Sequence, residues 1–162
     1  MAPPSIAIES ACAEDTHELG RLLGKNARPG DIFLLTGDLG AGKTTLPQGI
    51  LWGMGSDDYV RSPTFVLATE YVADMPLHHV DLYRIDGVDE MDELGLDELV
   101  EHGGVVVVEW AEKAAELFPS GRLQVDIERL GGDSRRLTLT AASAEYDRFL
   151  ELVSGHTAAG RG

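Results

Sequence analysis

The chain has 162 residues, 43% hydrophobic and 25% charged, and its 28 acids against 13 Lys and Arg give a formal net charge of −15. This length suits one domain with a single core, and the negative field argues against unaided binding of nucleic acids, whose phosphates it repels. Apolar runs are too short to span a bilayer and the N-terminus lacks a basic region followed by a long apolar stretch, so we expect a cytoplasmic protein without a membrane segment.

The first half of the chain alternates strand and helix patterns. In chain order, apolar periodicity predicts a strand at 5–10, a helix at 14–27, a buried strand at 32–37 and a helix at 43–54. Asp15 or Thr16 is the candidate N-cap of the first helix. Pro47 fits the second helix only in its first turn, because further along proline loses an amide hydrogen bond and clashes with the preceding turn.

The second half contains two pairs of strand-like segments. The pattern predicts a hairpin of 65–72 with 77–83, one or two acidic helices in 85–101, a central strand at 103–110, a helix at 111–118, a hairpin of 123–130 with 135–141 and a closing helix at 144–153. The acidic segment is either a solvated face or part of a partner surface. We predict an α/β fold: one domain over 1–155, with helices flanking a mixed central sheet, and a frayed tail at 156–162.

A glycine-rich loop, within LLTGDLGAGKTTLPQG, links the predicted strand at 32–37 to the following helix. Its spacing satisfies G-x-x-x-x-G-K-[ST], and the strand and helix around it are the context that this motif requires. Glycines let successive N–H groups converge on phosphate oxygens at a helix N-terminus, a Lys reaches the β and γ phosphates, and a Thr hydroxyl can bind Mg²⁺. The sequence therefore predicts a P-loop NTPase in which Gly37, Gly40, Gly42, Lys43 and Thr44 hold the nucleotide phosphates and the metal.

Hydrolysis of a bound nucleotide also needs a carboxylate at the end of a neighbouring strand. Glu109 follows four consecutive valines, as a carboxylate at the end of a central strand would, and the alternative is a strand end in solvent. Asp81 is a second candidate, and alternation puts it on the same strand face as His79. His79 and its neighbour His78 also fit ordinary hydrogen-bonded imidazoles. Trp110 fits either core packing or a place beside the nucleotide.

A Ser-Pro-Thr-Phe segment lies between the predicted P-loop helix and the next strand. P-loop enzymes often have a loop that senses the γ-phosphate at this place in the chain, so Ser62 and Thr64 are candidate switch residues. An ordinary turn is the alternative.

These motifs occur in a fixed order: GDLGAGKTT, SPTF, HVDLYR, ELGLDE and VVVEW. In that order they resemble the TsaE (formerly YjeE) family, small bacterial P-loop ATPases needed for threonylcarbamoyl modification of the adenosine beside the tRNA anticodon. The resemblance implies ATP and Mg²⁺ as cofactors, with TsaD and TsaB as partners and tRNA met only through their complex. It further implies an ATPase that is weak alone and acts as a switch on those partners.

The resemblance also implies roles for individual residues. Residues 37–45 would hold the ATP phosphates, and Thr44 and Glu109 would hold Mg²⁺. Asp81 would act near the attacking water or the metal. The other implied positions are the catalytic Lys43, Thr64 in the γ-phosphate-sensing loop, Trp110 near the nucleotide and Thr16 near the adenine. Two departures from the family pattern are Pro47 and the Ala that follows Trp110 in place of proline.

Other functions remain open at this point. A small-molecule kinase would usually carry an arginine-rich lid, and the arginines after the loop are scattered. A nucleotide-gated binding module without significant turnover would need the same phosphate and metal residues. A GTPase is disfavoured because no Asn-Lys-x-Asp motif follows the loop.

Overall fold

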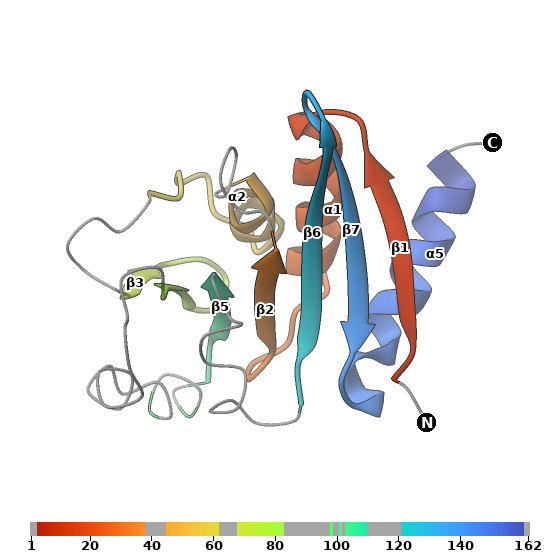
Figure 1. Ribbon diagram of the computed structural model, residues 1–162. Coiled ribbons are helices and arrows are strands. Elements are labelled where there is room, and N and C mark those ends of the chain that lie inside the picture. The colour runs from red at the N-terminus through yellow and green to blue at the C-terminus, as the bar shows by residue number, and fades with distance from the viewer. Residues whose placement is uncertain are drawn as a thin grey trace.

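A mixed sheet forms the centre of the protein (Figure 1). The computed structural model describes residues 3–37, 45–61, 68–82, 98, 101, 103–109 and 121–160. Within them the sheet has seven strands, β1 (Ser5–Ser10), β2 (Ile32–Gly37), β3 (Ala68–Tyr71), β4 (Leu77–Asp81), β5 (Val105–Glu109), β6 (Leu123–Gly131) and β7 (Ser134–Ala141). Their spatial order is β1-β7-β6-β2-β5-β4-β3.

Four neighbouring strands of this sheet run in the same direction. β2 pairs in parallel with both β6 and β5, and β5 pairs in parallel with β4. The outer pairs β3 with β4, β6 with β7 and β1 with β7 are antiparallel. Both predicted hairpins are therefore confirmed, as is the mixed sheet, and the carboxyl ends of β2, β5 and β4 meet at one edge.

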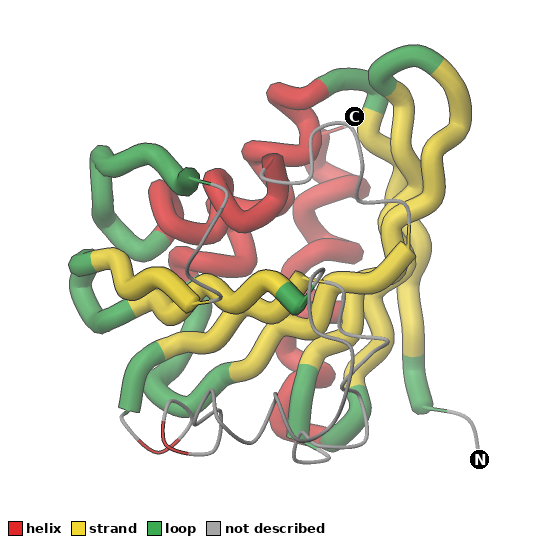
Figure 2. Tube along the Cα trace, turned by 60° about the vertical axis from the view of Figure 1, so that its left-hand side comes forward, coloured by secondary structure: helices red, strands yellow, loops and turns green. Residues whose placement is uncertain are grey.

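Three α-helices pack on one face of the sheet (Figure 2). They are α1 (Ala13–Lys25), α2 (Thr45–Gly53) and α5 (Asp147–Gly160), and a 3-10 turn, η3 (Ala144–Tyr146), precedes α5. The helices predicted at 85–101 and 111–118 fall almost wholly outside the described residues. α5 continues to Gly160, so helical backbone enters the segment predicted as a tail. No helix in the described ranges is long and apolar enough to cross a membrane.

Alternation along the inner strands separates two buried faces. Phe33 and Leu35 of β2 join the core beneath the helices, whereas Ile32 and Leu34 are buried on the opposite side. All five residues of β5 are buried as well. An interior parallel strand buried on both faces needs apolar residues throughout, which explains the four valines.

The start of α1 differs from the prediction. The N-cap position is Cys12, so the assignment of Asp15 or Thr16 as N-cap is wrong. The Asp15 carboxylate accepts the Ala11 N–H at 2.9 Å, and the Thr16 hydroxyl lies 2.6 Å from the Ser10 hydroxyl. These side chains therefore bond back to the segment between β1 and α1 from within the first turn. Several polar residues lie near the start of this helix, and the sequence did not show which residue occupies the N-cap position.

Pro47 is the third residue of α2, in the first turn of the described helix. Amide groups in a first turn have no acceptor within the helix, so proline is tolerated there. The departure at Pro47 is therefore compatible with a helix behind the glycine loop.

Glycines bring α1 and α2 into backbone contact. Gly20 and Gly24 on α1 face α2, and Gly49 and Gly53 on α2 face α1. A Cβ added at Gly24 would lie 2.0 Å from the Ile50 carbonyl oxygen, so no side chain fits between the two backbones. This spacing of small residues four apart lets helices approach closely and sets the position of α2 against the rest of the fold.

Substituting Gly24→Ala should lower the free energy of unfolding by about 3 kcal/mol, because the new methyl group overlaps the Ile50 carbonyl and the helices must separate. Urea unfolding followed by circular dichroism measures this. Gly155→Ala is the matched control: Gly155 lies in α5 with open space around it, and alanine there should stabilise by about 0.5–1 kcal/mol. Equal stability of the two variants would contradict the close helix contact.

Candidate functional site

The parallel strands bring three predicted site residues to one edge of the sheet. Gly37 ends β2, Glu109 ends β5 and Asp81 ends β4. Register places Glu109 opposite Leu35 on one side and opposite Asp81 on the other. Because carboxyl ends of adjacent parallel strands are the usual ligand-binding edge of an α/β sheet, this is the candidate site.

Gly37 has a backbone conformation that favours glycine. Its φ is +96°, and an added Cβ would lie 2.3 Å from the Ile127 carbonyl oxygen on β6. The chain thus leaves β2 through a position that tolerates no side chain. Thr45, the last residue predicted to contact phosphates, begins α2 on the far side of the loop.

Several predicted site residues lie outside the described ranges, and their assignments stay predictions. They are Asp38, Leu39, Gly40, Ala41, Gly42, Lys43, Thr44, Ser62, Thr64 and Trp110. The described part of the site therefore consists of the carboxyl ends of the strands and the start of α2.

Glu109 makes a buried pair with His79. The His79 Nε2 atom lies 2.7 Å from Glu109 Oε2, and both side chains are 0% exposed. Glu109 Oε1 is also buried and has no hydrogen-bond partner in the described structure. A buried carboxylate oxygen without a partner is costly, so it is a natural position for a cation or a donor group supplied by a ligand.

The sequence identified His79 only as an ordinary imidazole or a companion of Asp81. Its contact with Glu109 depends on β4 lying beside β5, which places His79 opposite Val107, two residues before Glu109. Alternation along the strand put His79 and Asp81 on one face, but the sequence did not show which strand lies beside it. The structure therefore adds His79 to the site as the residue that orients Glu109.

Asp81 is 5% exposed and pairs with Glu109 in the register. Two carboxylates at neighbouring strand ends supply the hard oxygen ligands that Mg²⁺ prefers. Among the residues that the structure describes, no group of three His, Cys, Asp or Glu side chains is arranged to hold a metal ion. The two carboxylates thus fit one part of a magnesium site, and Thr44, the other predicted ligand, lies outside the described residues.

Thr16 occupies a buried place in the first turn of α1, with 7% of its surface exposed. Its hydroxyl pairs with Ser10, and Ser10 Oγ in turn donates to the Cys12 carbonyl at 2.7 Å. These contacts give Thr16 a structural role where β1 meets α1. Its predicted position near an adenine stays a prediction.

Substituting Gly37→Ala should destabilise the protein by about 2 kcal/mol more than Gly30→Ala, because the two glycines share a positive φ but only Gly37 has a backbone oxygen in the way of a Cβ. Thermal unfolding measures the difference. Equal effects would mean that the β2–β6 contact at Gly37 relaxes without cost.

Substituting His79→Leu should cost about 3 kcal/mol of stability, because it leaves the Glu109 carboxylate buried without its partner. Replacing both residues, in His79→Leu/Glu109→Leu, should recover most of the loss, and urea unfolding of both single variants and the double variant gives the coupling. His78→Leu is the matched control, since its Nε2 atom is buried without a hydrogen-bond partner. If the effects of His79→Leu and Glu109→Leu on the free energy of unfolding were additive, this would contradict an interaction between the two side chains.

The chain is similar to known proteins over most of its length. The family model described as "Threonylcarbamoyl adenosine biosynthesis protein TsaE" matches residues 10–137. A Bacillus subtilis protein, named tRNA threonylcarbamoyladenosine biosynthesis protein TsaE, is 44% identical over 88% of this chain and 90% of its own. A Streptomyces coelicolor protein of the same name is 45% identical over 80% of this chain and 92% of its own.

A solved structure has the same fold. The crystal structure of Bacillus subtilis YdiB superposes with a TM-score of 0.80 at 36% identity and covers 97% of this chain and 99% of its own. The resemblance inferred from ordered motifs is therefore confirmed both by sequence and by structure. On these grounds the chain belongs to the TsaE family.

Proposed function

We propose that this protein binds and hydrolyses ATP with Mg²⁺ in the biosynthesis of tRNA threonylcarbamoyladenosine, and that its ATPase cycle acts as a switch on TsaB and TsaD partners in the cytoplasm. The observation that carries the proposal is the convergence of Gly37, Glu109 and Asp81 at the carboxyl edge of the parallel strands. The names of the relatives supply the pathway.

Each described residue has a distinct task in this proposal. Gly37 turns the chain out of β2 so that the following amides can face phosphate oxygens. His79 holds one Glu109 oxygen and leaves Oε1 without a partner, so Oε1 would be the atom that holds the metal or its water when these are bound. Asp81, beside Glu109, orients or accepts a proton from the attacking water. Mg²⁺, when bound, would neutralise charge on the phosphates.

The net charge supports a partner-mediated role. A chain at −15 is repelled by a tRNA backbone, so contact with tRNA through TsaD and TsaB avoids the need for a basic face. The phosphates of ATP can still be held, because backbone N–H groups and Lys43 act at short range.

ATP hydrolysis by the pure protein should be slow, should rise when TsaB and TsaD are added, and should fall at least about 100-fold in Lys43→Ala, which lacks the predicted phosphate contact. Asp81→Asn and Glu109→Gln should bind ATP but lose turnover, since they preserve shape and remove the carboxylate charge. Released phosphate and fluorescent-nucleotide affinity, measured in parallel, separate hydrolysis from binding.

Glu70→Gln is the control, because its side chain is exposed on β3 opposite His78, short of the edge at which β4 ends, and should leave turnover unchanged. Binding of ATP without turnover, with or without partners, would favour the nucleotide-gated module. Turnover that needs an added small-molecule acceptor would favour a kinase. Absence of adenine-nucleotide binding would remove the proposal altogether.

A further inference from the structure

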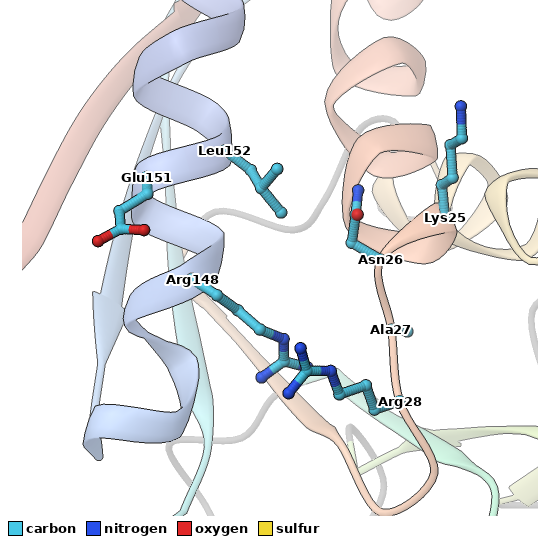
Figure 3. A pocket seen from close by; sticks show the side chains of 7 residues that line it. All are labelled: Lys25, Asn26, Ala27, Arg28, Arg148, Glu151 and Leu152. Carbon is cyan, nitrogen blue, oxygen red and sulfur yellow. The ribbon is translucent and has the colours of Figure 1, made fainter.

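A cluster of cationic side chains lies near the amino end of β2, at the end opposite the candidate ATP site. A cavity of about 600 Å³ opens between the C-terminal end of α1 and the first turns of α5. It is lined by residues 25–28 together with Arg148, Glu151 and Leu152 (Figure 3). Asp31, which Arg148 of the cavity contacts, directly precedes β2, and Gly37 ends it. At 3.3 Å per residue the two are about 20 Å apart, so this cavity is separate from the candidate ATP site.

Positive charge is concentrated around this cavity. Three of the 13 Lys and Arg residues line it, namely Lys25, Arg28 and Arg148, in a chain with 28 acids. Figure 3 shows the Arg28 and Arg148 side chains extending toward one another, while the Glu151 carboxylate points to the other side of α5. In an acidic protein such a cluster needs a physical reason.

Arg148 is held in place by contacts behind the cavity wall. Its Nη2 atom donates to Asp31 Oδ2, and its guanidinium carbon lies 4.2 Å from the centre of the Phe149 ring. The Nε atom is buried with no hydrogen-bond partner in the described structure. Since Nη1 also donates to the Glu145 carbonyl, the guanidinium is held on two sides, and it lines the cavity in a fixed position.

Carboxylates balance these cations only in part. Asp31 Oδ2 accepts the backbone N–H of Arg28 at 2.7 Å as well as the Arg148 side-chain bond, and Asp31 does not line the cavity, whereas Glu151 does. Burial raises the pKa of the Asp31 carboxyl, while the Arg28 amide and Arg148 act to lower it. The three cations Lys25, Arg28 and Arg148, set against the carboxylates of Asp31 and Glu151, leave an excess of about one positive charge.

The C-terminal carbonyls of α1 also face this region and oppose an anion through the helix dipole. Several are already occupied: the Asn26 amide nitrogen Nδ2 donates to the Leu22 carbonyl, and the Ala27 N–H donates to the Gly24 carbonyl. The local cations therefore dominate at the cavity mouth.

We propose that this cavity binds a phosphate monoester. Such a group carries a charge of about −1.5 to −2 at neutral pH, opposite in sign to the excess at the cavity, and guanidinium groups suit its geometry. The volume exceeds that of a phosphate alone, so the organic part of the ligand would lie against Leu152 and Ala27. The site is independent of the proposed ATPase activity.

The test uses full-length protein carrying Lys43→Ala, so that the glycine loop does not dominate phosphate binding. Inorganic phosphate, ribose 5-phosphate and uncharged ribose are titrated separately at constant ionic strength, and NMR shifts of the amides of residues 25–31 and 148–152 report occupancy. Ribose 5-phosphate should give saturable shifts, phosphate should compete with it, and ribose should do nothing. Saturation by phosphate alone, with no gain from the sugar, would assign the site to the free ion and overturn a monoester.

Arg28→Gln and Lys25→Gln should each weaken ribose 5-phosphate binding about tenfold, since both remove one exposed charge and leave the Asp31–Arg148 pair intact. Arg129→Gln, a distant exposed arginine, should leave affinity unchanged, and melting curves check that all variants fold. Unchanged affinity in both cavity variants, or identical shifts with chloride, would overturn the proposal. Binding of a short RNA with no response to ribose 5-phosphate would instead assign the cavity to a nucleic-acid backbone.

Discussion

The parallel pairing of β2 with β5, and of β5 with β4, is the constraint on which the candidate site depends. It brings Gly37, Glu109 and Asp81 to the same edge, although more than 20 residues separate each from the next in the chain. Interior parallel strands need apolar residues on both faces, and only at their carboxyl ends can polar groups reach a ligand. The interior position of β5 therefore explains both its valines, which are buried on both faces, and the carboxylate at its end, which lies at the ligand-binding edge.

The second requirement is a rigid support for the helix behind the glycine loop. Backbone contact between α1 and α2 through Gly20, Gly24, Gly49 and Gly53 leaves no space for a side chain. Such a contact resists sliding, because any shift brings backbone atoms into overlap. It connects the loop to α1, which packs in turn on α5 and on the core beneath the sheet. A displacement of α2 would thus also displace α1 and the core that packs against it.

Two pairs of polar side chains are buried beside the parallel strands, and each has partners for only some of its atoms. Glu109 has His79 on one oxygen and an open position on the other, and Asp31 has Arg148 beside it. The two pairs lie at opposite ends of the parallel strands. Three of their polar atoms, Glu109 Oε1, His79 Nδ1 and Arg148 Nε, are buried without a partner in the described structure. An unsatisfied buried group of this kind favours a ligand of opposite character, a cation at one end and an anion at the other.

By itself, the sequence determined the fold class, the two hairpins, the apolar interior strand and the family, because hydrophobic period and ordered motifs are local properties of the chain. It did not reveal the N-cap of α1, since several polar residues near a helix start can bond to the same backbone groups. The contact of His79 with Glu109 and the cavity beside Arg148 were decided by tertiary structure alone. Both depend on which strand or helix lies beside which, and that order is set by packing between segments far apart in the chain.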